Sequence, residues 1–189
     1  MEQKSSCKIY PINILSIIDT DYILSNYPSD QEMMPDQELP EHPILVDSEA
    51  VHMICRDSRG PVNGEGTTNL SFQARKGDYI FFRGTSTSAN SDSAIIIYNI
   101  QEEDHHHIFG PFNGENTSLA LAAEPSSETF NGVPAIHRHA DFHAFQSKIK
   151  KHGATTLAIQ FGLYTLEDDG ETQSLYGYFE WRAKIDVDH

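Results

Sequence analysis

Three histidines in the second half of the chain have a spacing found in metal sites. His137, His139 and His143 form the pattern His-x-His-x-x-x-His, and on a strand the first two would point to the same side. Imidazole nitrogens bind zinc, nickel and related ions, so a His-ligated metalloprotein is one hypothesis. The alternative is a set of surface histidines in a polar segment, because no glutamate follows to complete the ligand set.

A second set of polar residues has the oxygen atoms that calcium prefers. Asp19 and Asp21 follow an apolar segment, and Asn90 and Asp92 lie at the tip of a polar loop. If the two loops meet, the site would suit calcium, and the chain would resemble a calcium-dependent carbohydrate-binding module with a glycan as partner. The same residue types also stabilise turns through hydrogen bonds to nearby backbone, and no calcium-loop motif is present. Calcium is therefore a possible cofactor, and no other is expected.

The common catalytic motifs are missing from the sequence. There is no phosphate-binding loop, no Gly-x-Ser-x-Gly elbow and no Cys-x-x-Cys pair. Cys55 stands next to Arg56, but cysteines in apolar strands are usually inert core residues. The sequence names no catalytic residue and favours a protein that is not an enzyme.

A central hairpin positions the loop that carries Asn90 and Asp92. The turn signal Gly77-Asp78 precedes an aromatic and β-branched run at 79–82, which predicts a strand. Residues 84–93 are polar and predict a loop. Residues 94–100 are apolar almost throughout, which predicts a strand covered on both faces. Two buried strands joined by a polar loop favour the centre of a β-sandwich.

The carboxyl-terminal third has the clearest strand pattern. Leu157, Ile159, Phe161 and Leu163 occupy one face, with Gln160 and Tyr164 on the other, and apolar side chains alternate with polar ones over 175–187. Such alternation predicts strands with one face on the core and one face in water. Trp181 falls on the apolar face, whereas Tyr176 and Tyr178 fall on the polar face and are candidate contact residues.

The remaining segments complete the predicted domain. We expect strands at 8–18, 51–56 and 70–74, a short helical turn at 22–27, a turn at 113–114, and one or two helical turns at 118–124 within a crossover or lid. Four prolines and many acidic residues at 28–43 predict a flexible insertion. The predicted fold is a single mostly-β domain over residues 1–189. It is an antiparallel β-sandwich, jelly-roll or Greek-key-like, with few short helical turns.

The charge balance limits the possible partners. The chain has 13 basic and 28 acidic residues and a formal charge of −15, so binding to nucleic acid or to an anionic membrane surface is not expected. Full protonation of its ten histidines would reduce this charge to −15 + 10 = −5. Mild acid should therefore favour association. Two cysteines and no leader-like segment predict a cytoplasmic protein with free thiols.

Four stretches, in order along nearly the whole chain, carry a family resemblance. They are Ile18-Asp19-Thr20-Asp21-Tyr22-Ile23-Leu24 with Asn26-Tyr27-Pro28; His52-Met53-Ile54 with Ser58-Arg59-Gly60-Pro61-Val62 and Gly64-Glu65-Gly66-Thr67; Gly77-Asp78 with Phe82-Arg83-Gly84, Asn90-Ser91-Asp92 and Tyr98; and Leu175-Tyr176-Gly177-Tyr178. Through them the chain resembles the AidA/PixA family of bacterial inclusion-body proteins.

The resemblance implies a non-enzymatic, cytoplasmic protein. It also implies quorum-, phase- or stress-dependent expression and, in some members, deposition as inclusions. The expected partner is then the protein itself, as a homodimer or a larger assembly. The resemblance supplies no catalytic residue.

Overall fold

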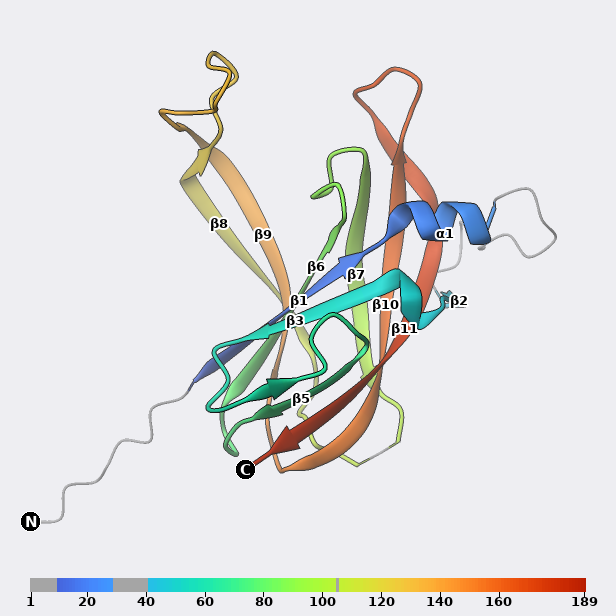
Figure 1. Cartoon of the computed structure of the whole chain (residues 1–189), viewed down its shortest axis with the longest axis vertical. Coiled ribbons are helices and arrows are strands. Elements are labelled where there is room, and N and C mark those ends of the chain that lie inside the picture. Colours follow the sequence, from blue (N-terminus) through green and yellow to red (C-terminus); the bar gives the residue numbers. More distant parts are fainter. Residues whose placement is uncertain (1–9, 29–40, 105) are drawn as a thin grey trace, which may run out of the picture.

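The computed structural model describes residues 10–28, 41–104 and 106–189, which are built mainly from strands (Figure 1). In chain order the elements are β1 (Pro11–Ile18), α1 (Thr20–Asn26), β2 (Ile44–Leu45), a 3-10 turn (Ser48–Ala50), β3 (Val51–Arg56), β4 (Val62–Asn63), β5 (Asn69–Gln73), β6 (Tyr79–Ser86), β7 (Ser93–Glu102), β8 (Asn113–Glu124), β9 (Ile136–Lys148), β10 (Gly153–Leu166) and β11 (Gln173–Asp188). No helix within the described residues has the length and hydrophobicity needed to cross a membrane.

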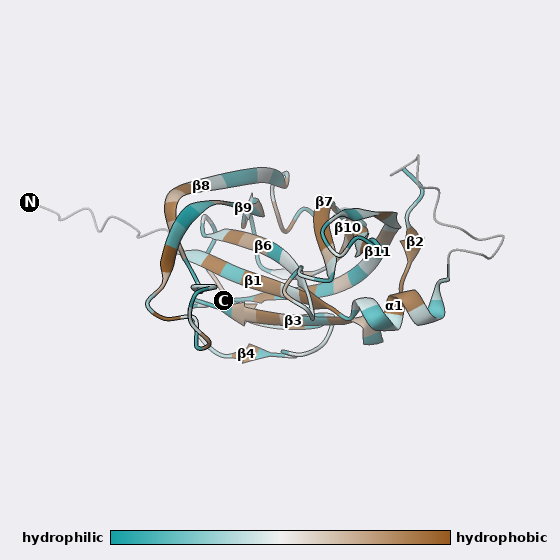
Figure 2. Ribbon diagram, turned by 90° about the horizontal axis from the view of Figure 1, so that it is seen from above, coloured by the Kyte–Doolittle hydropathy of each residue, from teal (hydrophilic) through white to brown (hydrophobic). Residues whose placement is uncertain are grey.

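The strands form two sheets, which confirms the predicted β-sandwich. The first sheet has the order β3-β1-β6-β9-β8, and Figure 2 shows these strands side by side. The second has the order β4-β5-β11-β10-β7, with β2 paired to β11. Both sheets are mixed rather than purely antiparallel, because β1 runs parallel to β6 and β11 runs parallel to β5 and β2.

Alternating side chains produce the core between the sheets. In β10 the predicted apolar face, from Leu157 to Leu163, is fully buried. In β11 the buried side chains include Phe179, Trp181 and Ile185, so the predicted core position of Trp181 is confirmed. Phe161 packs edge-on against Trp181 with ring centroids 5.5 Å apart. Residues at every second position therefore bury one face of β10 and of most of β11, as the period of a β-strand requires.

The alternation predicted for β11 fails at its beginning. The pairing register of β10 and β11 shifts between Leu163 and Tyr164, so one residue of β11 is extra at this point. Tyr176 consequently packs against the core, and its hydroxyl donates to the Tyr27 carbonyl at 2.7 Å. The prediction that Tyr176 shares an outer face with Tyr178 is wrong, because a β-bulge reverses the side of the strand on which a residue lies.

Four predictions between residues 84 and 124 are corrected by the structure. The segment predicted as helical turns, 118–124, and the turn predicted at 113–114 both belong to β8. Pairing with β9 overrides the helix propensity of its leucines and alanines. The loop predicted at 84–93 is shorter, because β6 continues to Ser86. β7 is not covered on both faces, since 51% of Ile96 is exposed.

Of the insertion predicted at 28–43, residues 29–40 lie outside the described part of the chain.

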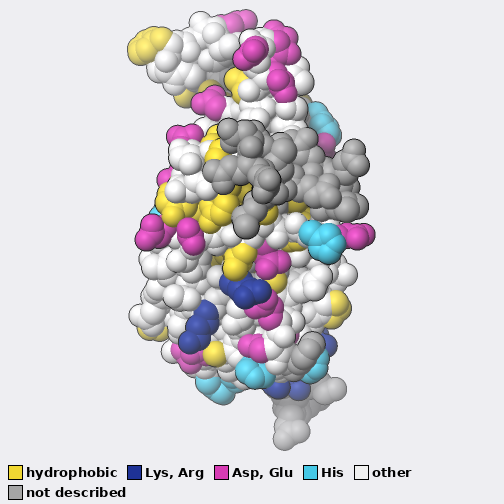
Figure 3. All heavy atoms as spheres, turned by 90° about the vertical axis from the view of Figure 1, so that its right-hand side faces the viewer, with side chains coloured by type: hydrophobic (Ala, Val, Ile, Leu, Met, Phe, Trp, Pro, Cys, Tyr) yellow, Lys and Arg dark blue, Asp and Glu magenta, His cyan; other side chains and the backbone are white. Residues whose placement is uncertain are grey.

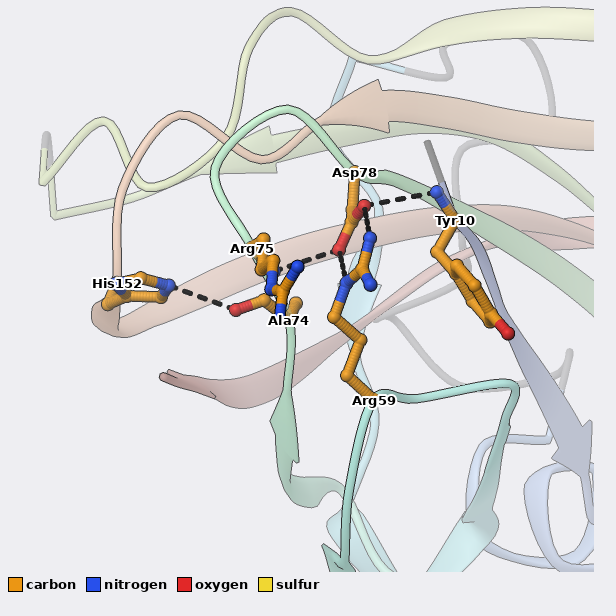
Figure 4. Close-up of polar contacts among 6 residues, drawn as sticks. All are labelled: Tyr10, Arg59, Ala74, Arg75, Asp78 and His152. Carbon is orange, nitrogen blue, oxygen red and sulfur yellow. Dashed lines mark hydrogen bonds and ion pairs between the residues drawn. The ribbon is translucent and has the colours of Figure 1, made fainter. Parts of the chain in front are cut away.

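A buried carboxylate fixes the end of the sandwich at which β1 and β6 begin (Figure 4). Asp78 accepts hydrogen bonds from Nε and Nη2 of Arg59 at 2.5 and 2.7 Å. It also accepts from the backbone N–H groups of Tyr10 at 3.0 Å and Arg75 at 2.8 Å. Its side chain is 3% exposed, and that of Arg59 is 19% exposed. The guanidinium also lies over the Tyr10 ring.

These contacts lower the pKa of Asp78. Burial by itself would raise this pKa, but the hydrogen bonds from Arg59, Arg75 and Tyr10 and the charge of Arg59 outweigh that effect. A carboxylate that accepts four hydrogen bonds has no lone pair left for a substrate. The perturbed pKa therefore marks a structural ion pair rather than a catalytic group.

Replacing Asp78 by Asn should lower the free energy of unfolding by about 3 kcal/mol at pH 7, because it leaves the Arg59 guanidinium without its counter-charge. A depressed carboxyl pKa stabilises the folded state above the ordinary Asp value of about 4, and this contribution is lost as the pH falls through the folded value. The difference between wild type and variant should therefore shrink below about pH 4.

Urea denaturation at pH 7 and pH 3 measures both effects. The exposed Asp168→Asn is the matched control and should change the free energy of unfolding by less than about 0.5 kcal/mol. Equal stability of the two variants at pH 7 would show that the Arg59–Asp78 pair does not hold this end of the sandwich.

Candidate functional site

Strands β8 and β9 form an arm that rises beside the rest of the sandwich (Figure 1). β9 pairs with β6 over only four residue pairs, from Tyr79↔Lys148 to Phe82↔Phe145. From Ala144 back to Ile136, the only described strand that pairs with β9 is β8. Almost every residue of β8 is exposed, and so is most of β9 from 137 to 143. The arm is therefore a two-stranded ribbon with water on both faces.

A groove separates the arm from the body of the sandwich. One cavity in it, of about 380 Å³, is bounded on the arm by Asp141, Phe142 and His143, and on the body by residues of β1, β6 and β7 that include Leu15 and Ile96. A second cavity of about 380 Å³ lies between β6 and the arm and also contacts Phe142. Phe142 thus lines both cavities.

Exposed apolar side chains are concentrated on the arm and the groove. Among the described residues, nine large hydrophobic side chains are exposed, and five of them belong to the arm and its tip. Two more, Leu15 and Ile96, line the groove. The five on the arm are Leu119, Leu121, Phe130, Val133 and Phe142. Scattered exposed hydrophobics need no explanation, but such a concentration indicates an interaction surface.

The groove is also bordered by strand edges that have no partner strand. Within the described residues, β9 from Ile136 to Ala144 pairs with β8 on one edge and with nothing on the other. β6 from Arg83 to Ser86 pairs only with β1. An unpaired edge presents backbone N–H and C=O groups and is a template for a further strand.

The predicted calcium ligands lie on two neighbouring loops. The Thr87 N–H donates to the Ile18 carbonyl at 3.0 Å, which brings the loop after β6 next to the end of β1. Asp19 is the N-cap of α1, where its Oδ1 accepts from the Tyr22 N–H at 2.9 Å. Asp21 lies exposed in the first helical turn. The loops meet as the hypothesis requires, but Asp19 already has the role of a capping residue.

Asn90 fills the space between the ends of β6 and β7. Its side-chain oxygen accepts from the N–H groups of Ser86 at 2.8 Å and Ile95 at 3.2 Å, and its amide donates to the Ile95 carbonyl at 3.4 Å. Its φ of 64° is in the left-handed region, which asparagine tolerates. The Gln173 amide donates to backbone carbonyls of this loop, Asp92 included. Asn90 therefore stabilises the turn, and calcium binding by these four residues stays a prediction.

The three predicted metal ligands lie in a row along β9. His137, His139 and His143 occupy alternate positions on one face, so His143 is about 13 Å along the strand from His139. The Nδ1 of His143 is 2.6 Å from Oδ1 of Asn116. Among the residues that the structure describes, no group of three or more His, Cys, Asp or Glu is placed to hold a metal ion. A site shared by all three imidazoles stays a prediction that this spacing does not favour.

Cys55 is fully buried in β3. Burial raises the pKa of its thiol to about 12, which keeps the sulfur protonated and unreactive. This agrees with the prediction of an inert core cysteine. Cys7 lies outside the described residues.

The comparisons with known proteins point to one family. The family model described as PixA, inclusion body protein, matches residues 10–187. The chain belongs to the PixA family. A crystal structure of the PixA inclusion body protein from Burkholderia cenocepacia J2315 has 30% sequence identity and a TM-score of 0.79, with 100% of both chains covered. The resemblance read from the sequence is thereby confirmed.

Other comparisons add nothing to this assignment. A cysteine protease inhibitor from Entamoeba histolytica has 18% identity over 64% of this chain and 86% of its own, with a TM-score of 0.27 that carries no argument. A search of the curated proteins found no match.

The arm of this PixA-family protein is the feature that sequence reasoning missed. A signal for β9 was present, because His137, His139, Asp141 and His143 alternate with Arg138, Ala140 and Phe142. Since neither set is uniformly apolar, the pattern of a half-buried strand was absent. A ribbon exposed on both faces leaves only a weak periodic signal.

Replacing Asn90 by Ala should lower the free energy of unfolding by about 2 kcal/mol. The change leaves the Ser86 and Ile95 N–H groups without their acceptor and places alanine in the left-handed region. Asp92→Ala is the control and should cost less than about 0.5 kcal/mol. Thermal melts with and without calcium measure both. A calcium-dependent rise in melting temperature that Asp92→Ala abolishes would instead support the calcium site.

Proposed function

We propose that this PixA-family protein is a non-enzymatic, cytoplasmic protein that associates with further copies of itself. The observation that carries the proposal is the concentration of exposed apolar side chains and unpaired strand edges on the arm and its groove. Family membership supports it, since the family is described as inclusion body protein. Stress-, phase- or quorum-dependent expression belongs to the same proposal.

The surface charge sets the balance between solubility and assembly. Acidic side chains are spread over the face shown in Figure 3, with few basic ones between them. A formal charge of −15 opposes contact between copies at neutral pH. Apolar contact at the arm must therefore outweigh the electrostatic repulsion between negatively charged copies. A change in net charge should shift the equilibrium between separate copies and the assembly.

The two alternative functions rest on the residues already located. A calcium-dependent carbohydrate-binding module would use Asp19, Asp21, Asn90 and Asp92, and calorimetry with calcium followed by a glycan array tests it. A His-ligated metalloprotein would use His137, His139 and His143, and metal analysis of protein purified without a nickel column tests that. Neither has the support of an open ligand set, because Asp19, Asn90 and His143 have hydrogen-bond partners within the chain.

Charges placed on the arm should stop the assembly from growing. We expect the particle size of the double variant Leu121→Glu with Phe130→Glu not to increase over a concentration series at pH 7.5, because carboxylates cannot be buried in an apolar contact. The matched control is Leu45→Glu with Leu166→Glu, which alters two exposed leucines away from the groove by the same charge. Light scattering measures the particle size. Identical behaviour of the two double variants would contradict a role for the arm.

Mild acid should increase the size of the wild-type assembly. Protonation of the ten histidines reduces the formal charge from −15 to −15 + 10 = −5, and weaker repulsion favours association. Light scattering between pH 7.5 and 5 checks this, with circular dichroism as the control for folding. A folded protein whose particle size stays constant over this range would contradict the proposal.

A further inference from the structure

We propose that the free edge of β9 pairs antiparallel with the same edge of β9 in a second copy, about a two-fold axis at Ala140. The inference rests on the proposed self-association and specifies its first contact. The interface would be a continuous four-stranded ribbon in the order β8-β9-β9-β8, with the two inner strands from different copies.

The available edge is long enough for such a contact. It runs over nine residues, from Ile136 to Ala144, which is about 30 Å of strand. Its midpoint is Ala140, so an antiparallel pair centred there uses the whole free segment. Two identical edges in antiparallel orientation are related by a two-fold axis, which is the commonest symmetry of homo-oligomers.

The order of charges along the edge favours this register. In an antiparallel pair centred on Ala140, a residue that lies a given number of positions before Ala140 is opposite the residue that lies the same number of positions after Ala140 in the second copy. The numbers of two opposed residues therefore add up to 280. His139 then faces Asp141 of the second copy, and symmetry repeats the contact. Within one copy, Nε2 of His139 lies 3.7 Å from Oδ1 of Asp141, and the Ser118 hydroxyl donates to the same oxygen. Both side chains are nevertheless exposed, 63% and 65%, so a second copy can reach them. An imidazole N–H donates to a carboxylate, so each contact is stabilising.

The other face of the ribbon agrees with the same register. Arg138 lies opposite Phe142 of the second copy, which suits a contact between a guanidinium and an aromatic ring. Ala140 faces itself across the axis, where a small side chain allows close approach. Phe142 lines the groove together with Leu15 and Ile96, so the arm of the second copy would enter a groove that is lined with apolar side chains.

Neighbouring registers are less favourable. Opposed residues of an antiparallel pair lie on the same face, so the two-fold axis must lie at a residue, and the nearest alternative centres are Asp141 and His139. Centring on Asp141 places this carboxylate opposite itself, which is destabilising. Centring on His139 also places His137 opposite Asp141, but it pairs only residues 136–142 and loses the pairs at both ends. The centre at Ala140 avoids both penalties.

Net charge also selects this edge. Residues 136–144 carry Arg138 and Asp141, a formal charge of +1 − 1 = 0 with the histidines neutral, within a chain of charge −15. Two copies that approach along β9 therefore meet where their mutual repulsion is weak.

A cysteine at the axis tests the register directly. In the full chain carrying Cys7→Ser, Ala140→Cys should form an intermolecular disulfide on mild oxidation, because directly opposed residues have Cβ atoms about 5 Å apart. Leu121→Cys, which is 74% exposed in its wild-type form, is the matched control on β8 and should cross-link far less. Non-reducing gels at low protein concentration measure the yield. Equal yields for the two variants would overturn the proposed pairing.

Charge reversal provides a test that needs no cross-link. Asp141→Lys at pH 7.5 should weaken dimerisation by about tenfold, because the carboxylate that accepts from His139 of the second copy is lost in two places. Adding His139→Glu should restore dimerisation, since a carboxylate then faces an ammonium group in both places. Analytical ultracentrifugation measures the dissociation constant, and circular dichroism confirms folding. A double variant as weak as Asp141→Lys alone would contradict the contact.

The outcomes separate this inference from the proposed function. Wild-type protein that stays monomeric at every concentration would overturn both. Wild-type protein that assembles while Ala140→Cys cross-links no better than its control would overturn only the β9 pairing, and self-association would then use another surface.

Discussion

The sandwich depends on one buried ion pair at the crossings between its sheets. Arg59 lies on the connection from β3 in the first sheet to β4 in the second, and Asp78 ends the connection from β5 back to β6. Their bidentate contact joins both crossings, and the Tyr10 N–H attaches the start of β1 to the same carboxylate. A buried carboxylate without these donors would be destabilising. The β3–β4 connection, the β5–β6 connection and the start of β1 must therefore come together when the protein folds.

A sandwich fixed at this end is free to open at the other. β9 begins to diverge from β6 four residue pairs away from the Asp78 turn, and from there on β8 is its only strand partner within the described residues. Its root is held by aromatic contacts, among them Phe82 with Phe112 and Phe109 with Phe112. The arm is thus anchored in the core at its base while its outer half contributes nothing to that core, which leaves its side chains available for contact between molecules.

The sequence predicted the strands whose side chains alternate between core and water. It missed the parts of the fold that depend on pairing with another strand or on contacts between residues distant in the sequence. Alternation located β10 and β11 and placed Trp181 in the core, because half-buried strands have a period of two. It could not locate β8, where Leu119 and Ala122 resemble a helix until β9 supplies backbone partners. It also could not reveal that Asp78 meets Arg59, a contact across 19 residues that no spacing rule encodes. For the candidate site, the sequence identified His137, His139 and His143, either as surface histidines or as metal ligands. It missed Asp141 between them, whose role as a partner depends on a free strand edge.

An exposed strand edge is ordinarily a hazard, and the pattern on β9 suits control of that hazard. A purely apolar edge would pair with any strand it met. On β9, like charges disfavour the register centred on Asp141, and the shorter pairing disfavours the register centred on His139. Two-fold pairing also uses the free β9 edge of each copy, so this contact by itself produces a dimer and no larger assembly. Growth to an inclusion then requires a second contact, and Leu121 and Phe130 remain exposed near the arm for that purpose. On this argument β9 sets which copies meet and in what orientation, while the apolar side chains and the net charge of the body decide how far assembly proceeds.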